Sequence, residues 1–269
     1  MKRSKVTALV GAAVLISGGA MALAKTSALG AASGACTYPA DVLDLKNWYE
    51  GLPIGEAEHP TTVRQPELAT YRKDPWFVAT SDCTGVRFRA AVNGVTTSGS
   101  SYPRSELREM TDNGTTEASW SSTSGTHTMV IKEAVTHLPN DKPQVVAGQI
   151  HGSDDDLSVF RLEGSKLYVT NGDDVHYKLV TSDYKLGTVF EAKFVVADGK
   201  INAYYNGTPV ATISSAFSGA YFKAGAYTQA NCDKSSPCDE SNYGEVVVHS
   251  LTVTHGNGGA GDDPSREHW

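Results

Sequence analysis

The sequence predicts an all-β protein, an antiparallel β-sandwich of the jelly-roll type with one concave, ligand-binding sheet. Short segments with a two-residue hydrophobic period recur along the chain, and turn residues separate them. Helical periodicity is nearly absent, apart from a candidate helix at 44–49. No linker divides the chain, so we expect one domain over 36–255. Residues 256–269 are rich in glycine and charge, which predicts a flexible tail.

The predicted strands follow one another with short connections. Each combines β-branched or aromatic residues with alternation, and they are expected at 86–92, 126–135, 145–151, 158–162, 166–170, 189–197, 200–205 and 244–254. Dipeptides and tripeptides that favour tight turns mark the connections at 93–94, 113–114, 139–141, 171–172, 198–199 and 206–207. Many short strands with turns between them favour a sandwich over a parallel sheet with helices.

The first residues predict export. Three basic residues at positions 2, 3 and 5 precede a small, apolar stretch over 6–24 that ends in Ala-Leu-Ala, the pattern of a signal peptide over 1–24. We expect cleavage between Ala24 and Ala35, and a secreted, extracellular protein without stable membrane insertion. A membrane anchor is the alternative, but Ser-Gly-Gly at 17–19 interrupts the stretch, which is short for a span of about 20 apolar residues.

The charge balance narrows the partners. The chain has a formal charge of −7, and loss of the three basic residues of the signal segment would make it −10. An acidic protein binds the negatively charged nucleic-acid backbone poorly, so we expect that this protein does not bind nucleic acid. It can still bind a polyanion if its basic groups lie together in one cleft, because the electrostatic potential inside a cleft depends on nearby charges more than on net charge. We expect Arg104, Arg108 and Lys223 to form such a basic cluster.

Four cysteines in an exported chain predict two disulfides. Of the three possible pairings we expect Cys36–Cys83, which would tie the mature N-terminus to the start of the sheet, and Cys232–Cys238, which would close a short loop. Metal binding is the alternative, but the spacings do not resemble a zinc site. The acidic run at 154–156 lacks the alternate spacing of a calcium loop. We expect no metal and no cofactor.

Three alternating segments carry the candidate functional residues: 104–108, 149–151 and 221–229. Side chains at i and i+2 of a strand share a face. The polar face so formed would present Arg104, Glu106, Arg108, Gln149, His151, Lys223, Tyr227 and Gln229. Leu107, Ile150 and Phe222 would turn towards the core. Cations, amides, an imidazole and a phenol on one face suit a polyanionic ligand and proton transfer better than packing.

These segments read Tyr-Pro-Arg-Ser-Glu-Leu-Arg-Glu-Met at 102–110, Gln-Ile-His at 149–151 and Tyr-Phe-Lys-Ala-Gly-Ala-Tyr-Thr-Gln at 221–229. In this form and order they resemble the alginate lyases of polysaccharide lyase family seven, as does the segment 39–48. The resemblance spans about 36–255. It implies a jelly roll whose concave sheet holds the uronate chain, and endo-type cleavage of alginate by β-elimination to 4,5-unsaturated oligouronates. Nothing in the sequence indicates more than a monomer.

The resemblance implies four catalytic residues, and their chemistry fits. Arg104 and Gln149 can neutralise the uronate carboxylate and the charge that develops beside it. His151, whose unperturbed pKa is about 6.5, can take the C5 proton. Tyr227 can protonate the leaving glycosidic oxygen. Substrate binding is expected from Glu106, Arg108, Tyr221, Lys223 and Gln229, with Glu106 fixing the guanidinium groups of the two arginines.

The sequence leaves other functions open. A non-catalytic polyuronate-binding module would use the same sandwich but would more typically offer aromatic platforms. A glycoside hydrolase needs two carboxyl groups across the bond, and Glu106 and Glu109 face opposite sides of their strand. The arginines and Glu106 could also be an ordinary surface ladder of ion pairs, worth less than about 1 kcal/mol. Each of these alternatives would leave His151 and Tyr227 without a catalytic role.

Position 150 bears on specificity. Isoleucine rather than valine at the centre of Gln149-Ile150-His151 is associated in the family with action on guluronate-containing blocks, so the resemblance implies that preference. Preference for polymannuronate is the alternative. Because Ile150 should face the core, its effect on His151 would be indirect.

Overall fold

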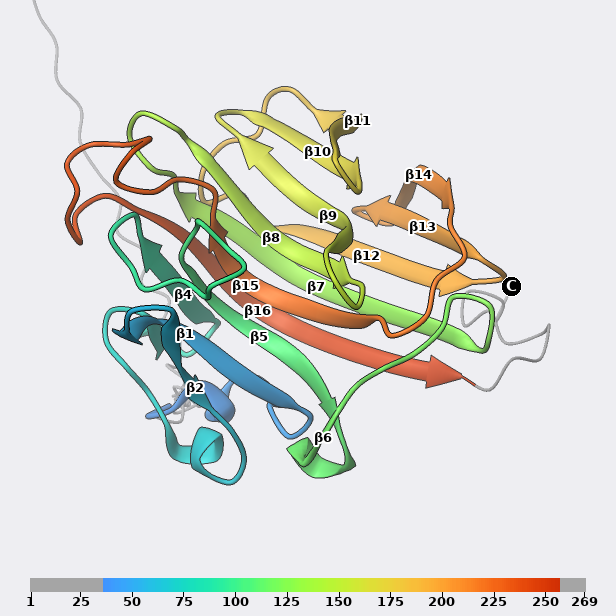
Figure 1. The fold of residues 1–269 in the computed structure, drawn as a ribbon, viewed down its shortest axis with the longest axis horizontal. Coiled ribbons are helices and arrows are strands. Elements are labelled where there is room, and N and C mark those ends of the chain that lie inside the picture. The colour runs from blue at the N-terminus through green and yellow to red at the C-terminus, as the bar shows by residue number, and fades with distance from the viewer. Residues whose placement is uncertain (1–35, 257–269) are drawn as a thin grey trace, which may run out of the picture. The chain divides into compact units, whose positions relative to one another are not determined.

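The computed structural model describes residues 36–256, which form two antiparallel sheets packed face to face (Figure 1). The strands of the nine-stranded sheet are β1 (Trp48–Glu56), β2 (His59–Val63), β5 (Arg104–Thr111), β6 (Thr116–Glu117), β8 (Gln144–His151), β9 (Asp156–Glu163), β10 (Lys166–Asn171), β11 (Asp174–Thr181) and β15 (Tyr221–Thr228). They lie in the order β11-β10-β9-β8-β15-β5-β1-β2, with β6 paired to β5.

The second sheet has seven strands: β3 (Phe77–Ala79), β4 (Val86–Ala91), β7 (Thr126–His137), β12 (Phe190–Ala197), β13 (Lys200–Tyr205), β14 (Thr208–Ser214) and β16 (Tyr243–Gly256). Their order is β14-β13-β12-β7-β16-β4-β3. Three short 3₁₀ helices lie in the connections: η1 (Pro39–Asp41), η2 (Glu67–Thr70) and η3 (Asp112–Gly114). Strands far apart in the chain thus lie side by side, and the jelly-roll sandwich predicted from the sequence is confirmed.

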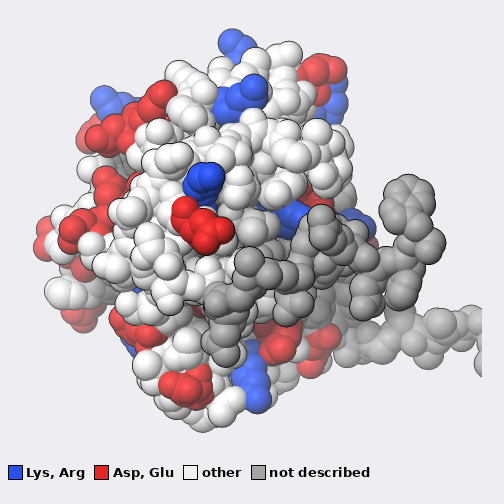
Figure 2. Space-filling view, turned by 90° about the vertical axis from the view of Figure 1, so that its right-hand side faces the viewer, with Lys and Arg blue, Asp and Glu red and all other residues white. Residues whose placement is uncertain are grey.

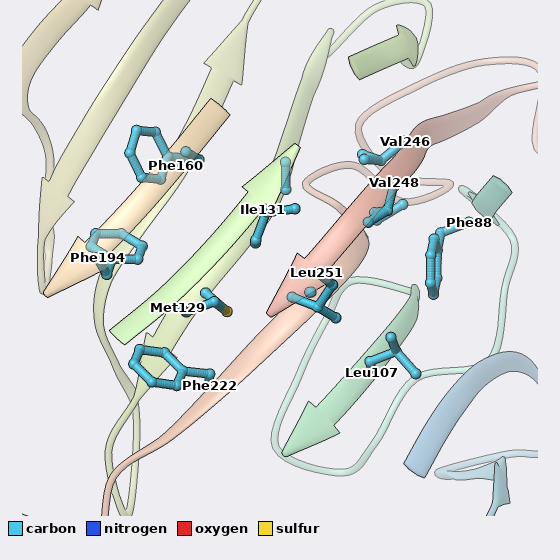
Figure 3. Close-up of a cluster of buried hydrophobic side chains, with 14 of the residues drawn as sticks. Phe88, Leu107, Met129, Ile131, Phe160, Phe194, Phe222, Val246, Val248 and Leu251 are labelled. Carbon is cyan, nitrogen blue, oxygen red and sulfur yellow. The ribbon is translucent and has the colours of Figure 1, made fainter. Parts of the chain in front are cut away.

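The core lies between the two sheets. Figure 3 shows side chains from both layers meeting there, including Phe222 and Leu107 of the first sheet and Phe194, Ile131 and Val248 of the second. All five are nearly or completely buried. Burial of apolar surface of this kind contributes about 25 cal/mol per Å². Since β5 and β15 bury alternate residues in this core, their remaining side chains must point away from it.

Each of the eight predicted strands corresponds to a strand of the structure, but the helix expected at 44–49 is wrong. Residues 44 and 45 have no regular structure, residues 46 and 47 form a turn, and β1 begins at Trp48. Leu45 and Trp48 are buried in the core, and Trp48 pairs with Glu109 of β5. The apolar spacing therefore reflects a turn that enters a strand. Asn113-Gly114 does form a turn, inside η3, where Asn113 has a φ of 63°.

Both expected disulfides are present. Cys36 is bonded to Cys83, and Cys232 to Cys238, with Cα–Cα distances of 5.6 and 4.8 Å. The signal peptide expected over 1–24, its cleavage site and the tail after residue 256 lie outside the described residues. Within 36–256, no helix has the length and hydrophobicity required to cross a bilayer. On the face drawn in Figure 2, acidic and basic side chains are scattered among uncharged ones.

Glycine at position 225 shapes the centre of β15. Its φ is +137°, a value that side chains rarely adopt, and a Cβ there would lie 2.6 Å from the Ser105 carbonyl oxygen. The pairing of β15 with β8 shifts register between Ala224 and Tyr227. The pairing of β15 with β5 has no such shift, and it places Tyr227 directly opposite Arg104.

Candidate active site

The three predicted segments meet on one surface. Strand β15 lies between β5 and β8, so the motifs at 104–108, 149–151 and 221–229 become neighbours (Figure 1). Lys223 is paired with Arg108 on one side and with Gln149 on the other. Tyr221 is paired with His151. We call the side of the nine-stranded sheet that points away from the core the outer face.

Glu106 is the centre of the outer face. Although it is only 2% exposed, its carboxylate accepts hydrogen bonds from the amide of Gln149 and from Lys223 Nζ, at 2.6 Å. Arg104 Nη1 lies 3.4 Å from the same carboxylate. Burial by itself would raise the pKa of Glu106, but Lys223 and Arg104, with the Gln149 hydrogen bond, outweigh it and lower the pKa. Glu106 is therefore an ionised anchor for three of the predicted site residues.

Lys223 is more enclosed than a substrate contact was expected to be. It is 7% exposed, and burial lowers the pKa of its ammonium group to about 8, against the opposing effect of Glu106. Its charge thus depends on Glu106, and Glu106 depends on it. The pair holds a fixed geometry next to Gln149, because a buried charge without its partner is costly.

Arg104 lies over an aromatic ring. Its guanidinium carbon is 3.8 Å from the centroid of the Tyr227 ring, an arrangement that stabilises both groups. Its side chain is 22% exposed, so the guanidinium group combines a fixed orientation with access from solvent. Arg104 is therefore placed to meet an anion that approaches the outer face.

Arg108 departs from the expected arrangement, in which Glu106 fixes both arginines. Among the described residues its ion-pair partner is Glu117 of β6, at 3.2 Å, and its guanidinium carbon lies 4.0 Å from the Tyr221 ring centroid. Glu106 contacts Arg104 alone of the two arginines. Because a strand twists, side chains two residues apart diverge, and the short β6 supplies a nearer carboxylate.

His151 is held between an aromatic ring and the backbone. It stacks on Tyr221 with ring centroids 5.0 Å apart, and its Nδ1 lies 2.7 Å from the Gly152 carbonyl oxygen. A carbonyl oxygen only accepts, so Nδ1 carries the hydrogen and Nε2 keeps a free lone pair. Burial lowers the pKa of His151 below its usual value, which favours the neutral ring at neutral pH. The geometry is that of a proton acceptor.

A cavity of about 140 Å³ opens beside these residues and is lined by Gln149, Tyr227, Gln229, Asp156 and Arg161, among others. Gln229 follows β15, and its Oε1 accepts a hydrogen bond from Arg161 at 2.8 Å, while its Nε2 is buried without a hydrogen-bond partner among the described residues. Its amide therefore has a donor left for a ligand.

Arg161 was not predicted from the sequence. It lies on β9, where it also bonds Gln144 at 2.6 Å and pairs with Glu163. Arg161 lies between Phe160 and Leu162, which are fully buried, and this alternation was the signal in the sequence that could have placed Arg161 on the outer face. A lone arginine in such a pattern is usually a solvated surface residue, so the signal is weak.

The acidic loop after His151 is next to the cavity. Burial and the neighbouring Asp155 raise the pKa of Asp156 to about 6. Within the described part of the chain, no group of three or more His, Cys, Asp or Glu side chains is arranged to hold a metal ion.

Comparison with known proteins gives a consistent result. A family model described as alginate lyase matches residues 43–255. The alginate lyase from Corynebacterium sp. is 64% identical with a TM-score of 0.81, covering 82% of this chain and 99% of that chain. AlgAT5 of polysaccharide lyase family 7 is 49% identical with a TM-score of 0.77, covering 81% and 98%. No curated protein matches significantly.

A more distant relative is a variant of the family 7 alginate lyase A1-II′, solved in complex with a substrate described as GGMG. It is 25% identical with a TM-score of 0.71, covering 84% of this chain and 100% of that chain.

A jelly roll whose outer face combines guanidinium, amide, imidazole and phenol groups defines a polysaccharide lyase that acts on an acidic polymer. The matching family model and the similar structures identify it further. The chain belongs to the alginate lyases of polysaccharide lyase family seven.

Proposed function

We propose that this chain is a secreted, endo-acting alginate lyase that cleaves by β-elimination and prefers guluronate-containing blocks. One observation carries the proposal: on a single face, Arg104 and Gln149 are both oriented by Glu106, next to a histidine with a free Nε2 and a tyrosine opposite Arg104. A binding module has no need of this combination of an anion clamp and two proton-transfer groups.

The first step is neutralisation of the uronate carboxylate at the reacting sugar. While that carboxylate is ionised, its C5 proton is only feebly acidic, because removal adds negative charge beside an existing one. Arg104 supplies a charge-assisted hydrogen bond to it. The amide nitrogen of Gln149 has two hydrogens, and since one is used by Glu106, the other is available to the uronate. Both donors then stabilise the enolate-like charge.

Two proton transfers complete the elimination. His151 Nε2 takes the C5 proton, and the electron pair of the C5–H bond forms the double bond between C4 and C5. The bond between C4 and the glycosidic oxygen breaks, and Tyr227 gives that oxygen its proton. The products are a new reducing end and a 4,5-unsaturated non-reducing end.

Guluronate and mannuronate differ in configuration at C5, so the proton to be removed lies on opposite faces of the ring. Separate base and acid groups on β8 and β15 suit the guluronate case. The GGMG ligand of the A1-II′ complex supports binding of guluronate-containing chains here by relationship. Initial rates on polyguluronate and polymannuronate blocks test the preference, and early product sizes separate internal from terminal cleavage. A faster rate on polymannuronate would contradict the proposed preference for guluronate but not the lyase activity.

The catalytic roles are tested by substitution at Arg104. Arg104→Ala should lose about 10²–10³ in turnover, because it removes a donor at developing charge, and Arg104→Lys should recover little, since an ammonium group does not reproduce a planar fork. The readout is the ultraviolet absorbance of the unsaturated product. Arg72→Ala, which removes an exposed arginine in the connection before β3, is the control and should keep wild-type turnover. Turnover above about a tenth of wild type in Arg104→Ala would contradict the clamp.

A further inference from the structure

Ser100 contacts the hydroxyl group of the proposed catalytic tyrosine. It lies in the connection between β4 and β5, and its Oγ is 2.9 Å from Tyr227 Oη. Three other polar contacts converge on the same atom: Arg104 Nη2 at 3.2 Å, the backbone nitrogen of Tyr102 at 3.2 Å and the backbone oxygen of Tyr102 at 3.1 Å. Neither the sequence motifs nor the proposed mechanism uses this serine.

Counting hydrogens shows that the Ser100 hydroxyl is held firmly in place. A serine hydroxyl donates one hydrogen and accepts two. The guanidinium group of Arg104 and the N–H of Tyr102 can only donate, so they occupy both acceptor positions of Ser100. The Tyr102 carbonyl oxygen can only accept, so it takes the hydrogen of Ser100. These three contacts keep Ser100 Oγ within hydrogen-bond distance of Tyr227 Oη, and either oxygen can be the donor between them.

The loop that carries Ser100 is fixed at a second point. The hydroxyl of Tyr102 accepts a hydrogen bond from Lys142 Nζ at 2.7 Å, and the same ammonium group lies 4.4 Å from the Tyr102 ring centroid. Lys142 precedes β8, so this contact joins the Ser100 loop to the far side of the outer face. A hydroxyl at position 100 is thereby held at a set distance from β15.

This arrangement matters when Tyr227 loses its proton. During elimination the O–H bond of Tyr227 breaks, its hydrogen moves to the glycosidic oxygen, and the electron pair remains on the phenolic oxygen. A phenolate only accepts, so the hydroxyl hydrogen of Ser100, whose Oγ is 2.9 Å away, can turn from the Tyr102 carbonyl oxygen to the phenolate and stabilise it as it forms. Arg104, 3.8 Å from the ring centroid, adds a positive charge beside it.

We propose that Ser100 is a positioning residue for Tyr227: it holds the phenolic oxygen in place and stabilises the phenolate that remains when the proton moves to the glycosidic oxygen. The proposal rests on the proposed role of Tyr227 as the acid. Ser100 itself touches neither the C5 proton nor the leaving oxygen in this scheme, so its effect should appear in turnover and not in substrate binding.

The test compares Ser100→Ala, Ser100→Thr and Ser98→Ala on purified full-length protein with polyguluronate. Ser100→Ala should lower kcat by about 10–100-fold with KM nearly unchanged, since it removes one hydrogen bond to a charged group. Ser100→Thr keeps the hydroxyl and should recover most of the turnover. Ser98→Ala alters an exposed serine of the same loop and should behave as wild type.

A double substitution separates this proposal from the role of Tyr227. If Ser100 acts through Tyr227, adding Ser100→Ala to Tyr227→Phe should cause no further loss of kcat, measured at high enzyme concentration. Unchanged kcat in Ser100→Ala, or an equal loss with and without the tyrosine hydroxyl, would overturn the positioning role. Wild-type turnover in Tyr227→Phe would instead overturn the assignment of the acid. Thermal unfolding of each variant shows whether the compared proteins are equally folded.

Discussion

Two glutamates, both removed from solvent, behave in opposite ways. Glu106 lies on the outer face and is surrounded by Lys223, Arg104 and Gln149, which lower its pKa against the effect of burial. Glu133 lies on β7, at the inward-facing spacing of Met129 and Ile131, and neither of its oxygens has a hydrogen-bond partner among the described residues. Burial raises the pKa of Glu133 to about 8.

The difference shows that burial of a charged residue does not by itself mark a functional site. At Glu106 the carboxylate is ionised and organises a set of donors of which the Arg104 guanidinium group is open to solvent, and its desolvation cost is offset by cations. At Glu133 the group is protonated at neutral pH and occupies space between the sheets. What identifies the outer face is the set of partners around the carboxylate, because these partners have hydrogens left for a ligand.

The largest effect should come from removing the charge of Glu106. Glu106→Gln leaves Lys223 and Arg104 facing each other without their anion, so we expect a loss of about 3–5 kcal/mol in unfolding free energy. Turnover should fall by at least about 10²-fold, because the donors to the uronate lose their orientation. Chemical denaturation and initial rates on alginate measure the two effects.

Glu109→Gln is the matched control on the opposite side of the same strand. Glu109 is also buried, and it accepts hydrogen bonds from Trp120 Nε1 and the Phe222 backbone nitrogen, at 3.0 and 2.8 Å. Its substitution should cost about 1–3 kcal/mol of stability and change turnover by less than about twofold. Equal losses of turnover in the two variants would mean that the Glu106 effect is structural.

The second prediction concerns Glu133 and pH. Its unfolded pKa is about 4.5 and its folded pKa about 8, so the folded protein holds the proton more tightly between these values. The contribution to stability is complete below about pH 4.5 and is lost as pH rises towards 8. Glu133→Gln does not titrate, so its stability relative to wild type should rise by about 1.4 kcal/mol per pH unit over that window.

Denaturation at pH 5, 6, 7 and 8 measures the slope. Glu191→Gln, on the adjacent strand β12 and partly exposed, is measured alongside as the control. If the stability difference between Glu133→Gln and wild type did not change with pH, the Glu133 carboxyl group would have polar partners in solution, as Glu106 does.

Local patterns in the sequence predict much of the outer face. The contacts that they do not predict arise from segments that are far apart in the sequence and close in space. Alternation predicted which residues of β5, β8 and β15 face away from the core, since it reflects the geometry of a single strand. The partner of Arg108 could not be predicted, because Glu117 belongs to a two-residue strand with no periodicity. Ser100 was missed for the same reason: it is a loop residue, and its contact with Tyr227 spans 127 positions.

The smallest expected effect separates the two sides of one strand. On β8, Gln149 and His151 face outwards, while Ile150 is fully buried and packs in the core. Ile150→Val removes one methylene group and should cost about 0.5–1.5 kcal/mol. If packing on the core side fixes the position of β8, the small space left behind shifts His151. The rate on polyguluronate should then fall relative to the rate on polymannuronate.

Leu162→Val, a buried change on the neighbouring β9, is the control: it should lower stability and leave the ratio unchanged. The measurement is the initial rate on each block polymer at equal folded concentration. An unchanged ratio in Ile150→Val, together with the expected loss of stability, would show that the core side of β8 contributes to folding only and that specificity resides entirely in the outer face.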